Sequence, residues 1–295
     1  MFLNAVCAAM AAVFFTGISA FSALAEHAGA VHTGQPVDWQ MGFQAAASPV
    51  MEGITDFHNM LLVIITVITI FVTVLLLYVI TRFKESSNPV PSRVTHNTAL
   101  EVAWTVVPIL ILVTIAIPSF KLLYFEDRAA DAEMTIKAIG EQWYWTYEYP
   151  DNGNFTFDSI MLEEDELDGH PRLLGVDNPV VLPVDTTVRV LLAAPPAGVI
   201  HSWAMPALGV KTDAIPGRLN ETWLKITQEG WYYGQCSELC GTRHAFMPIA
   251  IKAVSKEAFA AWVTTAQEEF ARNDDNDGNG SVRVAQNVVQ NQAQQ

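Results

Sequence analysis

The apolar positions of the chain follow two different patterns. Two uncharged apolar runs, from Met60 to Ile80 and from Val102 to Phe120, are each long enough to cross a bilayer, which takes about 20 helical residues. Beyond residue 130 the apolar residues form short β-rich runs bounded by Gly, Pro, Asn and Asp, as in the strands of an antiparallel sandwich or barrel. The pattern therefore predicts a transmembrane helical hairpin followed by an all-β domain.

The polar loop between the two apolar runs predicts their orientation. It carries Arg82, Lys84 and Arg93 against one acid, Glu85. The positive-inside rule places such a loop in the cytoplasm. The first 25 residues hold a short apolar run followed by an A-x-A pattern, which is typical of a cleaved signal peptide and leaves the mature N-terminus outside. Both features predict that the two termini and the β domain lie on the outer side.

Local signals divide the rest of the chain. Thr98 and Glu101 form a capping-box pattern, which predicts that the second membrane helix begins at Thr98. Ser255 precedes apolar residues at helical spacing, and the Asn- and Gln-rich residues further on are typical of disorder. The expected segments are a signal peptide (1–25), an external N-terminal arm (26–56), the helical hairpin (57–124, with spans at about 60–80 and 102–120), the β domain (125–254), a C-terminal helix (255–272) and a disordered tail (273–295).

The negative charge of the chain lies almost entirely in the predicted external part. Residues 125–295 contain 25 Asp and Glu against 12 Lys and Arg, which leaves −13 of the whole-chain net charge of −15 there. Such a surface repels nucleic acid, so we expect no nucleic-acid partner. It attracts a basic protein by long-range steering, although a plain solvated acidic surface has the same composition.

The chemistry-bearing residues gather in one stretch, GQCSELCGTRHAFM, at positions 234–247. It holds both cysteines that remain after loss of the signal peptide. Cys236, Cys240, His244 and Met247 offer two thiolates, an imidazole and a thioether, and such soft donors favour copper or another thiophilic metal. His201, in the run GVIHSW, is the best candidate for a further donor from elsewhere in the fold.

Several other interpretations fit the cysteines alone. In an oxidising compartment, two thiols this close can form a disulfide that only stabilises the domain. Two Cys and two His are also a formal zinc set, although the spacing differs from that of a zinc finger. A single blue-copper site uses two His, one Cys and a Met, which leaves one cysteine unexplained. A copper-delivery protein would bind one copper transiently.

The motif CSELCGTRHAFM, with GVIHSWAMPALG upstream and GEQWYWTYEYP at 140–150, resembles subunit II of the haem-copper cytochrome c oxidases, of bacterial type. The resemblance implies a cupredoxin-like sandwich or Greek-key barrel. It also implies an electron-transfer subunit that accepts electrons from cytochrome c and passes them to haem in subunit I. Oxygen reduction to water and proton pumping would occur in that other subunit. The quinol oxidase subunit and the nitrous oxide reductase domain are related alternatives, disfavoured by the intact ligands here and by the membrane hairpin, respectively.

The resemblance also assigns roles to individual residues. The implied ligands of a binuclear CuA centre with two copper ions are Cys236 and Cys240 as bridging thiolates, His201, His244, Met247 and the backbone carbonyl of Glu238. The other implied roles are electron acceptance from cytochrome c at Trp143, cytochrome c docking at Glu148, Asp158 and Asp177, a magnesium or manganese ion shared with subunit I at the Glu238 side chain, subunit I contact at Arg218, and the entrance of a proton path at Glu101.

The resemblance finally implies partners and a location. The chain would assemble with the haem-containing subunit I and with subunit III, and it would cross the bacterial inner membrane more than once. The copper domain and both termini would then lie on the periplasmic side. This expectation agrees with the orientation that the charged loop predicts.

Overall fold

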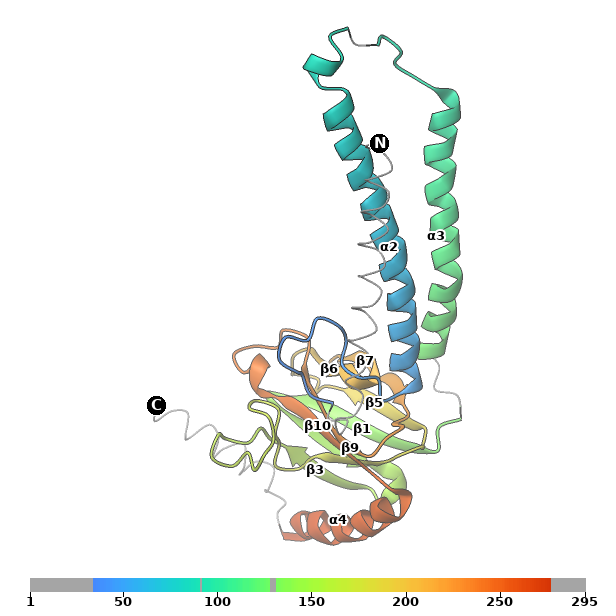
Figure 1. Ribbon diagram of the computed structural model, residues 1–295. Coiled ribbons are helices and arrows are strands. Elements are labelled where there is room, and N and C mark those ends of the chain that lie inside the picture. The colour runs from blue at the N-terminus through green and yellow to red at the C-terminus, as the bar shows by residue number, and fades with distance from the viewer. Residues whose placement is uncertain (1–33, 91, 128–130, 277–295) are drawn as a thin grey trace. The chain divides into compact units, whose positions relative to one another are not determined.

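The computed structural model of the protein describes residues 34–90, 92–127 and 131–276 (Figure 1). The predicted signal peptide and most of the predicted tail lie outside the described residues, as does Cys7. Within them, two long helices are followed by a β-sandwich and a C-terminal helix. This order confirms the predicted fold class.

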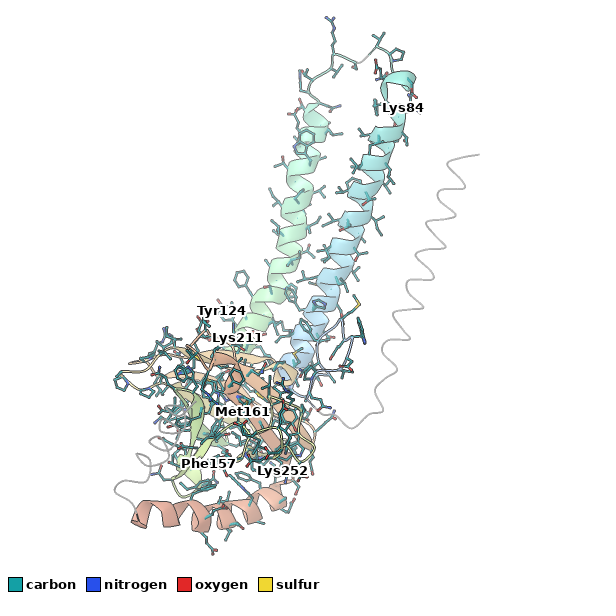
Figure 2. The ribbon with its side chains drawn as sticks, turned by 90° about the vertical axis from the view of Figure 1, so that its left-hand side faces the viewer. Lys84, Tyr124, Phe157, Met161, Lys211 and Lys252 are labelled. Atoms are coloured by element: carbon teal, nitrogen blue, oxygen red, sulfur yellow. The ribbon has the colours of Figure 1, made fainter. Side chains whose placement is uncertain are left out.

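The two long helices are α2, Pro49–Arg82, and α3, Thr98–Glu126, which run side by side in Figure 1. Both are long and apolar enough to cross a membrane. The loop between them contains the short 3₁₀ helix η2, Glu85–Ser87, and Lys84, which Figure 2 labels. Threonine hydroxyls along α2, including those of Thr66 and Thr69, donate to the carbonyl four residues earlier, so these polar groups are satisfied without water.

α2 begins earlier than predicted, whereas α3 begins at Thr98 as predicted but with a different cap. α2 begins at Pro49, inside the segment predicted as an arm, because Ser48 caps it: Ser48 Oγ accepts from Met51 N at 3.0 Å. The predicted cap at Thr98 of α3 is wrong. Asn97 is the N-cap, its Oδ1 accepting from Leu100 N at 3.2 Å, while Glu101 Oε1 accepts from Asn97 N at 3.2 Å. Asparagine is a better N-cap than threonine, so Asn97 takes this position.

The β domain consists of two five-stranded sheets packed as a sandwich. In order across the first sheet, the strands are β3 (Phe155–Ser159), β2 (Tyr144–Tyr149), β1 (Met134–Glu141), β5 (Val188–Ala193) and β8 (Asn220–Leu224). Across the second they are β4 (Val180–Pro183), β10 (Pro248–Val254), β9 (Gly230–Cys236), β6 (His201–Met205) and β7 (Val210–Ala214). The remaining short 3₁₀ helices are η3 (Pro150–Asn152), η4 (Pro206–Leu208) and η5 (His244–Phe246).

Strand direction departs from the prediction at two places. β1 pairs with β5 in parallel, and β4 pairs with β10 in parallel, whereas the other strand pairs are antiparallel. The expectation of an antiparallel sandwich throughout is therefore wrong. The strand-like runs of a sequence do not show which non-neighbouring strands pair. The two parallel pairings are therefore decided only by tertiary packing.

The core lies between the sheets and is rich in aromatic rings. β1 and β2 alternate buried and half-buried residues, as expected for strands with one face on a core. Tyr149 is fully buried, and its hydroxyl donates to Val181 O at 3.0 Å and accepts from Val181 N at 3.1 Å. Trp203 Nε1 donates to Tyr147 OH at 3.2 Å. These bonds satisfy polar atoms that would otherwise be costly to bury.

The C-terminal helix α4, Lys256–Asn276, packs against the edge strand of each sheet, β3 of the first and β4 of the second. Ser255 Oγ accepts from Ala258 N at 3.2 Å, as its predicted capping role requires. Phe270 stacks on Phe157 of β3, labelled in Figure 2, with ring centroids 4.8 Å apart. The helix continues past the predicted boundary at 272, since no glycine or proline interrupts the chain before Gly278.

Candidate metal centre

Three neighbouring strands of the second sheet bring the predicted ligands together. β9 runs antiparallel to both β6 and β10, so its C-terminal end lies beside the N-terminal ends of those strands. His201 is the first residue of β6, Cys236 is the last of β9, and Met247 directly precedes β10. The sheet therefore fixes three of the donors at one edge.

The loop from β9 to β10 carries the other two side-chain donors. Cys240 lies in this loop, and His244 begins η5. The backbone holds the loop closed: Ser237 N donates to Ser202 O at 3.0 Å, and Cys236 N donates to Met247 O at 3.4 Å. Because these bonds tie the loop to β6 and to its own far end, they limit how far the donors can separate.

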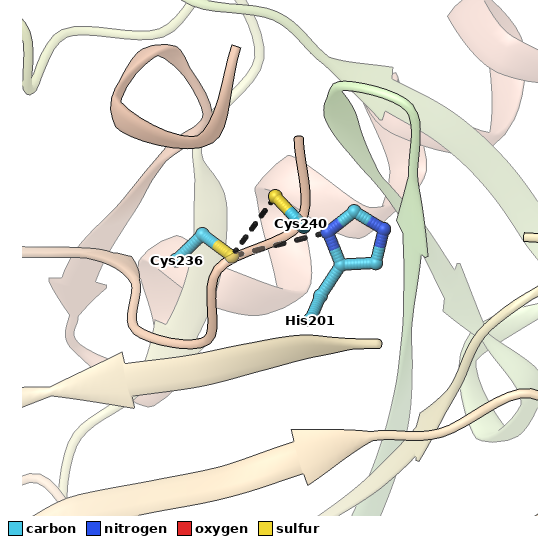
Figure 3. A group of neighbouring side chains, drawn as sticks. All are labelled: His201, Cys236 and Cys240. Carbon is cyan, nitrogen blue, oxygen red and sulfur yellow. Dashed lines mark hydrogen bonds between the residues drawn. The ribbon is translucent and has the colours of Figure 1, made fainter. Parts of the chain in front are cut away.

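The donor atoms form one compact group, and Figure 3 shows its three residues His201, Cys236 and Cys240. Cys236 Sγ lies 3.7 Å from Cys240 Sγ and 3.8 Å from His201 Nδ1. On the other side, Cys240 Sγ lies 3.5 Å from His244 Nδ1 and 3.6 Å from Met247 Sδ. The group is buried apart from His244, which is half-buried.

The backbone carbonyl of Glu238 completes this group. Its oxygen lies 3.4 Å from Cys236 Sγ, while the residue as a whole is exposed. The two cysteines therefore have a ring of other donors around them: one imidazole and one carbonyl beside Cys236, one imidazole and one thioether beside Cys240. All six predicted ligand residues are brought together.

The distances fit metal binding better than a disulfide. A disulfide has an S–S length of about 2.05 Å, and both thiols are free here. Donor atoms that share a tetrahedral metal ion with bonds of about 2.0–2.3 Å lie about 3.3–3.8 Å apart. The neighbouring pairs in this group are 3.4–3.8 Å apart. Two sulfur atoms at this separation can each contact two metal ions.

Burial controls the protonation of the metal-free group. It lowers the pKa of His201 to about 4, with a smaller contribution from the nearby His244, so the His201 imidazole is neutral and has a free lone pair at neutral pH. Burial, followed by the neighbouring Cys236, raises the pKa of Cys240. The thiol therefore stays protonated at neutral pH until a bound metal ion displaces the proton.

Two tryptophans of the run QWYW contact the group from the first sheet. Trp143 is half-buried in the β1–β2 turn, and its Nε1 donates to Cys240 O at 2.9 Å. Trp145 is fully buried, its Nε1 donates to Met247 O at 3.3 Å, and its ring lies 5.9 Å from that of His201. Each ring therefore holds a ligand residue by a hydrogen bond or by packing.

Comparison with known proteins identifies the family. Residues 134–254 match the family described as cytochrome C oxidase subunit II, periplasmic domain, and residues 36–122 match the family's transmembrane domain. The probable cytochrome c oxidase subunit 2 of Rickettsia bellii (strain RML369-C) is 51% identical over 82% of this chain and 89% of that protein. This chain belongs to the cytochrome c oxidase subunit II family. The resemblance carried by the cysteine motif and the aromatic run is thereby confirmed.

Two further subunit II proteins are more than 50% identical to this chain over the residues matched. The cytochrome c oxidase subunit 2 of Oenothera berteroana is 52% identical over 77% of this chain and 90% of that protein. The crystal structure of the periplasmic domain of subunit II of cytochrome oxidase of Bradyrhizobium japonicum is 58% identical, covers 48% of this chain and 99% of that one, and has a TM-score of 0.46.

The acids predicted to dock cytochrome c have different surroundings in this subunit II chain. Glu148 forms an ion pair of 3.0 Å with Lys137 on the adjacent strand. Asp158 Oδ1 accepts from Thr146 Oγ1 at 2.6 Å. Asp177 is exposed, and its Oδ1 accepts from Ile160 N at 2.7 Å. Each acid thus has a local partner, which is a sufficient structural reason for its presence, and the docking role stays a prediction.

The remaining predicted residues are also placed by the structure of the subunit II chain. Arg218 is exposed in the turn between β7 and β8. Glu101 bonds to the cap of α3, as described above, which is a structural role of its own. Neither observation tests the subunit contact or the proton path.

Sequence reasoning missed three kinds of residue near the centre. Gly140 lies against the His201 ring, and an isolated glycine at the end of the strand run MTIKAIG is the available signal. Glu141 is close to Asp158, which, after burial, raises the pKa of Glu141. Leu239, between the two cysteines, is 80% exposed although its neighbours Cys236 and Cys240 are buried.

The charge on Asp158 is expected to destabilise the folded domain. Burial raises the pKa of Asp158 above 3.8, so the folded chain binds this proton more tightly than the unfolded chain does. Asp158 therefore lowers the free energy of unfolding most when the pH is above its folded pKa. This destabilisation shrinks as the pH falls through the folded pKa towards 3.8, the ordinary value of the group. Asp158→Asn, which keeps an acceptor for Thr146, should melt at a higher temperature than the wild type at pH 7.

Melting curves of the two proteins at pH 7 and pH 4 test this expectation. The difference between Asp158→Asn and wild type should shrink at pH 4, since a larger fraction of the wild-type carboxyl is protonated there than at pH 7. Asp165→Asn, at an exposed acid of the 162–178 loop, is the control and should leave the melting temperature unchanged at both pH values. A variant less stable than wild type at pH 7 would contradict the expectation.

Proposed function

We propose that this subunit II chain binds two copper ions as a CuA centre and relays single electrons from cytochrome c to haem in subunit I of a respiratory oxidase. The family is that of an electron-transfer subunit of cytochrome c oxidase, so the chain is an oxidoreductase subunit and a membrane protein. One observation carries the finer proposal: two free thiols 3.7 Å apart, surrounded by two imidazoles, a thioether and a carbonyl at 3.4–3.8 Å.

The donor set favours copper over zinc. Thioether sulfur is a soft ligand that selects copper, and zinc sites use Cys, His and carboxylate instead. Held by this donor set, two copper ions would supply one-electron oxidation and reduction. The proposed ligands are Cys236, Cys240, His201, His244, Met247 and the Glu238 carbonyl.

The chain's own contribution is to fix these ligands and to shield them. The sheet edge holds His201, Cys236 and Met247 on rigid strands, which keeps the change in geometry on electron transfer small. Trp143 connects the half-exposed surface to the Cys240 backbone, so it is the proposed position at which an electron arrives from cytochrome c. Burial of the cysteines excludes water from the centre.

The acidic surface supports the proposed cytochrome c partner. Glu141, Asp158 and Asp177 lie close together: desolvation and then the Asp158 charge raise the pKa of Glu141, and desolvation raises that of Asp177 against its backbone hydrogen bonds, with a smaller contribution from Asp158. An acid whose charge lowers stability is retained where function needs it, and a basic protein would relieve the repulsion. We assign docking to Asp158 and Asp177 on this ground, and to Glu148 on the family resemblance alone.

Further partners complete the proposal. The exposed Glu238 side chain offers hard oxygen atoms for a magnesium or manganese ion shared with subunit I. The exposed Leu239 and Arg218 fit a contact surface for the same subunit. Subunit III is a further proposed partner. Glu101 is the proposed start of a proton path.

We place the chain in the bacterial inner membrane as a multi-pass protein, with both termini and the copper domain on the periplasmic side, because the α2–α3 loop is basic.

Copper content and electron paramagnetic resonance of the purified oxidase test the proposed function together. We expect two copper ions per subunit II chain beyond the copper of other subunits, and hyperfine splitting that shows one unpaired electron shared by both. One copper with a mononuclear spectrum would favour copper delivery instead. No copper and a Cys236–Cys240 disulfide in a folded domain would leave only a structural role for the motif.

A further inference from the structure

Gly140 of β1 lies directly against the side chain of His201. A Cβ atom built at Gly140 would lie 2.7 Å from Cδ2, 2.8 Å from Cγ and 2.9 Å from Cβ of His201. Separations under 3.0 Å are essentially never seen for real Cβ atoms, so something must shift. The imidazole of His201 therefore occupies the space that any side chain at position 140 would need.

The backbone does not explain the glycine. Six other glycines of the described residues have a positive φ, which favours glycine, and Gly140 is not among them. It sits in a regular strand, paired with Trp145 across the β1–β2 ladder. A glycine inside a strand weakens the strand and often marks a close approach of another group. What glycine provides here is space on the buried face of β1.

The His201 ring cannot move freely away from Gly140. It is fully buried, and the Trp145 ring flanks it at 5.9 Å in an edge-on arrangement. Its Cδ2 edge faces Gly140, while its Nδ1 lies 3.8 Å from Cys236 Sγ. A push on the Cδ2 edge must therefore turn or shift the Nδ1 atom relative to the cysteine pair.

We propose that Gly140 is a positioning residue that sets the orientation of the His201 imidazole at the copper centre and thereby its reduction potential. The inference rests on the proposed function, because it takes His201 to be a copper ligand. Gly140 has no side-chain donor atom and would act on a bound metal only through His201. A displaced imidazole is a weaker donor, and weaker donation disfavours the oxidised centre.

The test is Gly140→Ala in the purified oxidase complex, with copper content, the electron paramagnetic resonance spectrum and a redox titration as readouts. We expect the full copper content, an upward shift of the reduction potential, and hyperfine splitting that shows a less equal distribution of the unpaired electron over the two copper ions. A role in packing alone would change the melting temperature and leave the spectrum and the potential unchanged.

Ile136→Val is the matched control, because Ile136 is fully buried on the same face of β1. It should lower stability and leave the spectrum and the potential at their wild-type values. A Gly140→Ala complex with a wild-type spectrum and potential overturns the inference, and so does one that does not assemble, since the inference requires an intact domain. A wild-type complex without two copper ions in this chain would instead refute the proposed function.

Discussion

Replacing Cys236 with serine is expected to reduce the copper content of the centre from two ions to at most one and to lower cytochrome c oxidation at least about 100-fold, beyond the loss typical for residues that only support a ligand. Cys236 Sγ contacts Cys240 Sγ, His201 Nδ1 and the Glu238 carbonyl. A serine hydroxyl is a hard donor that does not replace a bridging thiolate on copper. The substitution is therefore expected to weaken copper binding at both metal positions.

The residual donors predict what the variant becomes. Without Cys236, the group retains two histidines, one cysteine and one methionine, which is the ligand set of a mononuclear blue-copper site. Any copper that Cys236→Ser retains should thus give a mononuclear spectrum, with the unpaired electron on one ion. Ser237→Ala is the control, because Ser237 is exposed in the same loop, its hydroxyl bonds only to Gln235 O, and the substitution keeps its backbone bond to Ser202 O. Two copper ions in Cys236→Ser would refute bridging by this thiolate.

The prediction from sequence succeeded where one local signal dominates. The two apolar runs and the strand-length runs were sufficient for the hairpin and the sandwich, because length and period decide those elements. It failed where two local signals compete within a residue or two. Asn97 and Thr98 are both good caps, and only the structure decides between them.

The candidate site was predictable only in part. The four donors of the 236–247 loop are visible as a cluster in the sequence, whereas His201 joins them only because β6 lies beside β9. The role of Gly140 was not predictable, because glycine has no side chain whose chemistry indicates a function. Its importance follows from the His201 ring, which occupies the space that a side chain would need. Contacts between distant strands are therefore what the sequence left undetermined.

Replacing Trp143 with phenylalanine is expected to slow electron transfer from cytochrome c about 100-fold, the size of effect that a misplacement of about 1 Å can have on an oriented reaction. Trp143 is half-buried, and its Nε1 donates to Cys240 O at 2.9 Å. Phenylalanine keeps an aromatic ring but loses this bond, so the ring is no longer tied to the backbone of a ligand residue. Copper content and the spectrum should stay at wild-type values, because Trp143 provides no ligand.

Rapid-mixing experiments separate this role from docking and from damage to the centre. Reduced cytochrome c should reduce the centre of Trp143→Phe slowly even at saturating concentration, while a small chemical reductant should reduce it at the wild-type rate. Trp231→Phe is the matched control, since Trp231 is also half-buried but packs with His170 and Tyr233, away from the cysteine loop. A slow step that saturating cytochrome c abolishes would place Trp143 in docking. An unchanged rate would mean that electrons reach Cys240 by another path, because the 2.9 Å bond is then not part of it.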